Sequence, residues 1–302
     1  MAFTDGLLAR FRSGSMLIKI IYVNVAVFVL LRLAVIAAAL LGIDSQAVLQ
    51  AVEVPSQAAV LLRRPWTLIS YMVSHYGVLH LLFNMLWLYW LGQMFLDYFT
   101  PKQLTGLYVL GGIGGALLYV AAGSLLPVMR QQQGMLIGAS AAVLAVVAAV
   151  AVAAPNRAVR LFLIGDVPLK WVAAATLLLD LLSMEVGNAG GHIAHIGGAA
   201  VGLAYGLAMR GGHDITAWLN AAIDAVCTLL KPRKSTRKGV GSPVGGRSYR
   251  KAKPASAAPQ PQEEGPTEAE IDAVLDKIKR SGYSALTDAE RDTLFRASSK
   301  RN

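Results

Sequence analysis

Six apolar stretches, each long enough to cross a lipid bilayer, limit what this chain can fold into more than any other feature. A hydrocarbon core of about 30 Å takes roughly 20 helical residues to cross, and in lipid the backbone must satisfy its own hydrogen bonds. Prolines fall near the ends of the stretches, where they interrupt no helix. The predicted spans are residues 17–42, 72–97, 103–127, 134–154, 161–184 and 191–210.

The sequence therefore predicts an all-α fold, a polytopic membrane bundle of six transmembrane helices. Hydrophobic residues make up 55% of the 302 residues and charged residues 15%, and the apolar residues run together instead of alternating with polar ones. A cleavable signal peptide is the alternative for the first stretch, but its apolar run is far longer than a signal-peptide core. The single cysteine, Cys227, excludes an intrachain disulfide.

The basic character of the chain is local. The formal net charge is +10, and nearly all of that excess lies between Lys231 and Lys253, where there is no acidic residue. We therefore expect no nucleic-acid partner. The basic segment instead predicts either a contact with anionic lipid or a retention signal that fixes the topology.

The distribution of basic residues between the predicted loops indicates the orientation. One side of the membrane carries both termini and most of the basic residues, and the positive-inside rule makes that side the cytoplasm. Arg63, Arg64 and Arg130 lie on the other side. Arg32 falls inside the first span, where it either snorkels or pairs within the bundle, with Asp180 of the fifth span as a candidate mate.

Two histidines, His192 and His195, stand at the outer end of the sixth span. Ionisable groups inside a span are costly and usually functional. Gly198, Gly202 and Gly206 follow His195 at steps of three, four and four residues, so all four lie on one helix face. Small residues at this spacing allow a second helix to approach closely. The alternative is a packing histidine beside a glycine seam.

Ser140 is the only hydroxyl-bearing residue in the fourth predicted span. We expect it about six residues, or roughly 9 Å, below the outer end of that helix. Serines in transmembrane helices usually serve packing or bond to the backbone. Opposite a histidine at the same depth, however, a serine gains the base that it needs to act as a nucleophile.

His80 and Asn84 lie four residues apart, on one face of the second span and again at its outer end. Acyl transfer requires hydrogen-bond donors aimed at the developing oxyanion. These two side chains and the Ser140 backbone N–H, near a helix N-terminus, can supply such donors. The alternative is that each polar residue serves packing alone and that their common depth is chance.

Three short motifs carry a family resemblance. Residues 80–84 read HLLFN, residues 138–140 read GAS and residues 194–198 read AHIGG. In this order, across six spans, they resemble the motifs of the rhomboid family of intramembrane serine proteases. The resemblance extends over roughly residues 15–210.

The resemblance implies a serine endopeptidase that cuts transmembrane segments of membrane proteins near their outer end, using a Ser–His dyad without an acidic third member. Ser140 would be the nucleophile and His195 the general base and acid, while His80, Asn84 and the Ser140 N–H would hold the oxyanion. It further implies no cofactor, no metal, and a place in a bacterial cytoplasmic (inner) membrane. The residues in supporting positions are Gly138, Gly198 and Gly202.

Two positions depart from the family pattern. Ala141 replaces the final glycine of the family's GxSG motif, and its methyl group is expected to tighten the oxyanion pocket without abolishing activity. Leu144 stands where some members carry an aromatic ring that stacks on the histidine, which leaves the orientation of His195 less constrained. We expect His75 and His192 to line the aqueous approach or to satisfy backbone groups, and not to bind a metal.

Two other functions are compatible with these features. A catalytically inactive rhomboid-like protein would bind transmembrane helices without cutting them, although such relatives typically lack the serine or the histidine. A transporter or proton relay would use intramembrane histidines as well, but it would place ionisable groups through the bilayer instead of at one depth.

Beyond the membrane bundle the sequence predicts a modular tail. Capping boxes at Thr267 and Glu270, and at Thr287 and Glu290, each open a short helix. A helix pair this small hardly buries a core of its own, so we expect it to bind a protein partner or to self-associate. The predicted divisions are an N-terminal cytoplasmic segment (1–16), the protease domain (17–210), an interfacial amphipathic helix (211–230), a basic and proline-rich linker (231–266) and the helical tail (267–302).

Overall fold

The structure is a computed structural model. It describes residues 11, 13–127, 129, 135–161, 164–184, 188–230, 267–281 and 286–299. The chain divides into two compact units, Met1–Lys234 and Ser235–Asn302. Residues 1–10 of the predicted N-terminal segment 1–16, and the whole predicted linker 231–266 with its basic cluster, lie outside the described residues.

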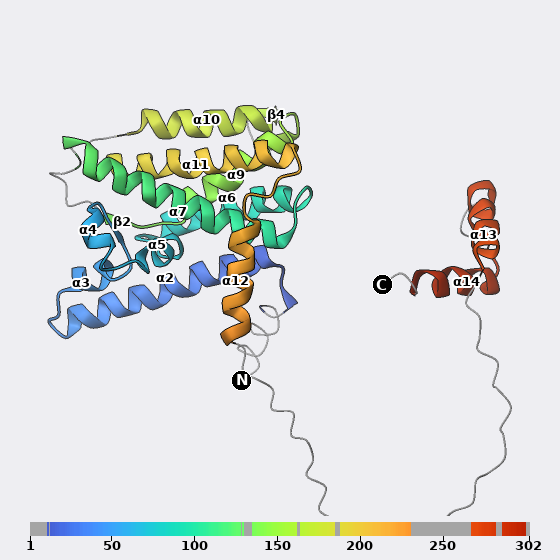
Figure 1. Cartoon of the computed structure of the whole chain (residues 1–302), viewed down its shortest axis with the longest axis horizontal. Coiled ribbons are helices and arrows are strands. Elements are labelled where there is room, and N and C mark those ends of the chain that lie inside the picture. The colour runs from blue at the N-terminus through green and yellow to red at the C-terminus, as the bar shows by residue number, and fades with distance from the viewer. Residues whose placement is uncertain are drawn as a thin grey trace, which may run out of the picture. The chain divides into compact units, whose positions relative to one another are not determined.

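The first unit is a bundle of apolar helices, as predicted (Figure 1). In this view α10 lies along one edge and α2 along the opposite one, with α6, α7, α9 and α11 between them. Among the described residues four helices, α2, α6, α7 and α11, are long and apolar enough to cross a membrane. The six helices are α2 (Met16–Leu40), α6 (Val78–Leu96), α7 (Pro101–Leu125), α9 (Ser140–Ala153), α10 (Leu169–Leu182) and α11 (Ala189–Arg210).

The fourth and fifth helices are shorter than predicted, with 14 residues each. Residues 135–136 are not helical, because strand β2 (Met135–Leu136) pairs with β1 (Val54–Pro55) and Gly138 then adopts a φ of 135° that favours glycine. Residues 161 and 165–168 belong instead to an antiparallel pair of strands, β3 (Ala158–Leu161) and β4 (Gly165–Pro168). Helix α10 therefore begins directly after a proline.

Helix α9 is the centre of the bundle, and ten consecutive residues, 141–150, are buried. At 1.5 Å per residue it is about 21 Å long, less than the hydrocarbon thickness. Because α6, α7 and α11 all pack on it, α9 is enclosed by protein and need not span the lipid by itself.

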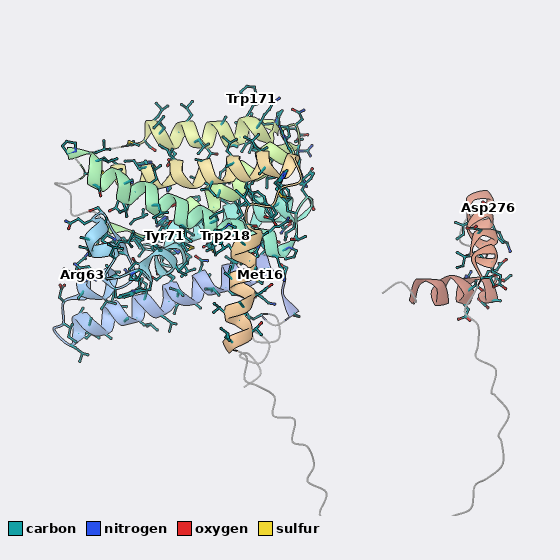
Figure 2. All side chains as sticks on the ribbon, in the orientation of Figure 1. Met16, Arg63, Tyr71, Trp171, Trp218 and Asp276 are labelled. Carbon is teal, nitrogen blue, oxygen red and sulfur yellow. The ribbon has the colours of Figure 1, made fainter. Side chains whose placement is uncertain are left out.

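The connection from α2 to α6 folds into short helices instead of extending the second span from residue 72. Two buried tyrosines anchor it: the Tyr71 hydroxyl donates to the Gly112 carbonyl, and the Tyr108 hydroxyl donates to the Met72 carbonyl, each at 2.6 Å. Figure 2 labels Tyr71 within the bundle. The short elements are α3 (Ser45–Gln50), α4 (Ala58–Leu61), α5 (Thr67–Ser70) and the 3-10 turn η1 (Tyr71–Val73).

Helices α9 and α11 meet backbone to backbone. A Cβ added to Gly198 would collide with the main chain of Ala141, and one added to Gly202 would collide with that of Ala145. The glycine face predicted for the sixth span thus packs on the helix that carries Ser140.

After the bundle, α12 (Ala217–Leu230) follows a cap in which Asp214 accepts the Thr216 N–H at 2.8 Å. An ion pair of 2.7 Å between Lys102 and Asp224 ties it to the start of α7. The predicted amphipathic helix therefore exists, beginning six residues later than expected.

The second unit contains α13 (Glu268–Ser281) and α14 (Asp288–Ser299). Both predicted capping boxes form: Glu270 accepts the Thr267 N–H at 2.9 Å, and Glu290 accepts the Thr287 N–H at 2.7 Å. Lys277 joins the two helices through an ion pair of 2.8 Å with Glu290.

Candidate active site

Ser140 is the first residue of α9, preceded by the non-helical segment that carries Gly138. The prediction that it lies several residues down a helix was wrong, because the non-helical segment 135–139 replaces the first turns. The first N–H groups of a helix have no partner within it. Ser140 therefore presents both its hydroxyl and its backbone N–H at a helix N-terminus.

His195 faces this serine from α11. Its Nε2 atom lies 2.6 Å from Ser140 Oγ, a short hydrogen bond, and the His195 side chain is 20% exposed. The contact joins residues 55 positions apart in the chain. Because the glycine seam holds α9 and α11 together one turn further along, main-chain packing sets the separation of these two side chains.

The other ring nitrogen of His195 contacts an acid. Asp180 Oδ1 of α10 lies 2.7 Å from His195 Nδ1 and 2.9 Å from His192 Nδ1. Asn188 Nδ2 lies 3.4 Å from His192 Nε2 at the outer side of this network. The structure thus arranges serine, histidine and aspartate in sequence, with a second histidine on the same carboxylate.

Sequence reasoning missed this role of Asp180. The pairing with Arg32 is wrong: Arg32 is exposed on α2, and the Asp180 carboxylate instead accepts hydrogen bonds from two histidines. The available signal was an acid within the apolar run 171–184, near the end where His192 and His195 also lie. The predicted roles of His192, lining an aqueous approach or satisfying the backbone, give way to this contact.

A cavity of about 300 Å³ adjoins the serine. Asn84 from α6 lines it together with Ser140, His195 and Asp180, and the Asn84 amide donates to the His80 carbonyl at 2.8 Å. The apolar walls come from Phe83, Trp87, Val143, Leu144 and Val147.

The ring of His80 lies against Gly138. A Cβ at Gly138 would lie 2.6 Å from His80 Cε1, so the glycine leaves room for the ring. His80 lines a second cavity of about 680 Å³, together with the buried Glu53 and with Asn188. The structure therefore brings Asn84, but not His80, into the same cavity as Ser140.

Three further predictions concern neighbouring side chains. His75 is buried and its Nε2 accepts the Ala139 N–H at 3.4 Å, so it satisfies a backbone group as expected. The Ala141 methyl packs toward Gly115 of α7, where an added Cβ would lie 2.6 Å from it. Ala141 therefore does not narrow the serine cavity, contrary to expectation, whereas Leu144 does line it.

Asp180, His192 and His195 also form a cluster whose potential metal-ligand atoms lie within 4.8 Å of one another. Both Nδ1 atoms, however, already lie at hydrogen-bond distance from one carboxylate oxygen, and His195 Nε2 lies on Ser140. These contacts describe a hydrogen-bonded network. The absence of a metal remains a prediction from the sequence.

Comparison with known families places the same residues within one domain. A family model described as a rhomboid domain matches residues 62–212, half of the chain, which includes helices α6 to α11. A second, described as a family of unknown function (DUF6576), matches residues 263–300. No curated protein matches the chain significantly.

Proposed function

Because this chain belongs to the rhomboid family, we propose that it is an intramembrane serine endopeptidase that cleaves transmembrane segments of membrane proteins near their outer end. The chain is an integral membrane protein, with helices long and apolar enough to cross a bilayer. The observation that carries the proposal is the 2.6 Å contact between Ser140 Oγ and His195 Nε2. A protein that only bound transmembrane helices would not require this contact.

In the proposed reaction, Ser140 Oγ attacks the scissile carbonyl carbon while its proton passes to His195 Nε2. The resulting tetrahedral intermediate collapses as the carbon–nitrogen bond breaks and the same proton passes to the leaving amine. Water then attacks the acyl ester, again with His195 as base, and releases the second product and free Ser140.

The oxyanion is stabilised by the N–H of Ser140 at the start of α9 and by the Asn84 amide, which lines the same cavity. His80 is the third donor in this proposal, and its ring, which lines the neighbouring cavity in the structure, would have to turn toward the oxyanion. The neighbouring cavity of about 680 Å³, lined by Glu53 and His80, supplies the water that hydrolysis consumes.

We further propose a bacterial cytoplasmic membrane as the location, with both termini in the cytoplasm, because the basic residues of the chain accumulate on that side. The segment from Lys231 to Lys253 then faces anionic lipid headgroups. The helical tail is placed on the same side, where it binds a protein partner or a second copy.

A fluorophosphonate probe tests the proposed activity in purified full-length protein in liposomes. We expect labelling of the wild type and none of Ser140→Ala or His195→Ala. Ser124→Ala is the matched control for the serine, because the Ser124 hydroxyl donates to the Val120 carbonyl of its own helix, α7. His213→Ala is the matched control for the histidine. An unlabelled wild type that still binds a transmembrane peptide would favour the inactive helix-binding protein.

A further inference from the structure

The carboxylate of Asp180 is shared by two histidines of the same helix. Its Oδ1 lies 2.7 Å from His195 Nδ1 and 2.9 Å from His192 Nδ1. The three side chains are only 17%, 20% and 8% exposed, in the order Asp180, His195, His192. A partly buried carboxylate at these distances is held mainly by the two N–H donors.

Asp180 comes from a helix of the bundle that has few buried residues. Only Leu169 and Ala173, both in the N-terminal part of α10, are buried. Further along, the helix is flanked by the cavity of about 300 Å³ beside Ser140 and by an apolar cavity of about 630 Å³ toward α9 and α11. Asp180 lines both cavities, so its hydrogen bonds to His192 and His195 link this part of α10 to α11.

We propose that Asp180 is a positioning residue, which turns the serine–histidine pair into a Ser140–His195–Asp180 triad, and that His192 holds its carboxylate in place. The inference rests on the proposed protease function. It adds an acid to a mechanism that the family resemblance describes without one.

The reason lies in the tautomer of His195. To accept the serine proton, Nε2 must carry a lone pair, so the ring proton must reside on Nδ1. A carboxylate at 2.7 Å from Nδ1 accepts that proton in a hydrogen bond and selects this tautomer. It also stabilises the imidazolium that forms when the serine proton arrives, as the aspartate does in soluble serine proteases.

His192 plays a supporting part. Its Nδ1–H donates to the same oxygen at 2.9 Å, and its Nε2 lies 3.4 Å from Asn188 Nδ2. Without this second donor, the carboxylate could rotate away from His195 into either adjoining cavity. Displacing the C-terminal part of α10 would likewise separate Asp180 from His195. The Nδ1–H tautomer of His195 is therefore selected only while α10 keeps this position.

The first test measures the rate of fluorophosphonate labelling, and kcat and KM toward a transmembrane peptide, in full-length protein. We expect Asp180→Asn to lower kcat by about 10²-fold or more with little change in KM, since the equivalent change in a soluble serine protease costs about 10⁴-fold. His192→Phe keeps a ring without the donor and should give a smaller loss. Asp166→Asn is the control, because it makes the same acid-to-amide change at a carboxylate that pairs with Arg160 in the β3–β4 strand pair, outside the site.

The second test reads the tautomer directly by NMR of protein labelled with ¹⁵N-histidine, where His195→Gln identifies the signal. We expect the Nδ1–H form in the wild type and a mixture in Asp180→Ala. Wild-type kcat in a folded Asp180→Asn protein, with an unchanged tautomer, would overturn the inference and leave the protease standing. An inactive wild type with the Nδ1–H form that is lost in Asp180→Ala would retain the positioning role and reject the protease. If Asp180→Asn fails to fold, His192→Phe takes its place. A lower kcat with a mixture of His195 tautomers would support the inference, and wild-type kcat with the Nδ1–H form alone would overturn it.

Discussion

Replacing Gly198 by alanine tests whether backbone contact between α9 and α11 sets the catalytic distance. The new Cβ would lie 2.6 Å from the Ala141 carbonyl carbon and 2.8 Å from its Cα, and closer still to its carbonyl oxygen, whereas ordinary Cβ contacts begin at 3.4 Å. All three atoms are main chain, so no side-chain rotation relieves the overlap. The two helices must therefore move apart by about 1 Å.

That movement is large compared with the site. The Ser140–His195 contact of 2.6 Å would lengthen to about 3.6 Å, beyond hydrogen-bond range. A misplacement of about 1 Å can cost a catalytic site about 10²-fold, and overpacking a core costs about 1–3 kcal/mol. We therefore expect Gly198→Ala to lower the labelling rate about 10²-fold and to lower Tm.

Two other glycines provide matched controls for the same change. Gly77 has no atom within 4 Å of an added Cβ, and at Gly92 the nearest atom is the end of the flexible Leu17 side chain. Alanine at either position should leave the labelling rate near that of the wild type. Wild-type labelling and Tm in Gly198→Ala would refute the reasoning, because the helices would then tolerate a methyl group at their closest contact.

Three further changes have distinct expected outcomes. Lys277 and the capping threonine lower the pKa of Glu290 to about 2 from its ordinary 4.5, so its contribution to α13 and α14 is present above pH 4.5 and lost as the pH falls toward 2. The helical circular-dichroism signal should therefore melt at a lower temperature as the pH falls over that range, and the shift should be smaller in Glu290→Gln. Gly138→Ala should abolish labelling, since φ is 135° there and the new methyl meets the neighbouring imidazole; labelling at the wild-type rate would contradict this. Tyr108→Phe leaves the buried Met72 carbonyl without its 2.6 Å donor and should cost about 1–3 kcal/mol in unfolding, so an unchanged Tm would show that another donor replaces it.

The helices could be predicted from the sequence because length and apolar composition determine which segments cross a membrane. Helix starts were less predictable where local backbone chemistry overrides composition. Residues 135–139 are as apolar as the helix that follows, but β2 pairs across the fold with β1, and this partner is invisible to a reading of one segment. The β3–β4 pair was missed for a different reason: the apolar residues of these two neighbouring strands, such as Leu161 and Val167, counted toward the fifth apolar stretch.

The candidate site shows a similar division. Periodicity placed His195 and its glycines on one face, which the structure packs on α9. It could not place Asp180, because the rotation of α10 about its axis depends on neighbours far away in the sequence. Nor could spacing separate His80 from Asn84: the Asn84 amide turns back to the His80 carbonyl, whereas the His80 ring lies against Gly138 and lines the other cavity.

The unequal packing of α9 and α10 divides the candidate site by its contact with lipid. Helix α9, with Ser140 at its start, is surrounded by protein, and its buried residues 141–150 do not contact the acyl chains. Helix α10 exposes Leu178, Leu179, Leu181 and Leu182, each at 50% or more, around the residue that contacts both histidines. Changes in bilayer thickness or lateral pressure are therefore expected to act on Asp180 while Ser140 stays fixed, so the composition of the surrounding membrane becomes a variable of the proposed reaction.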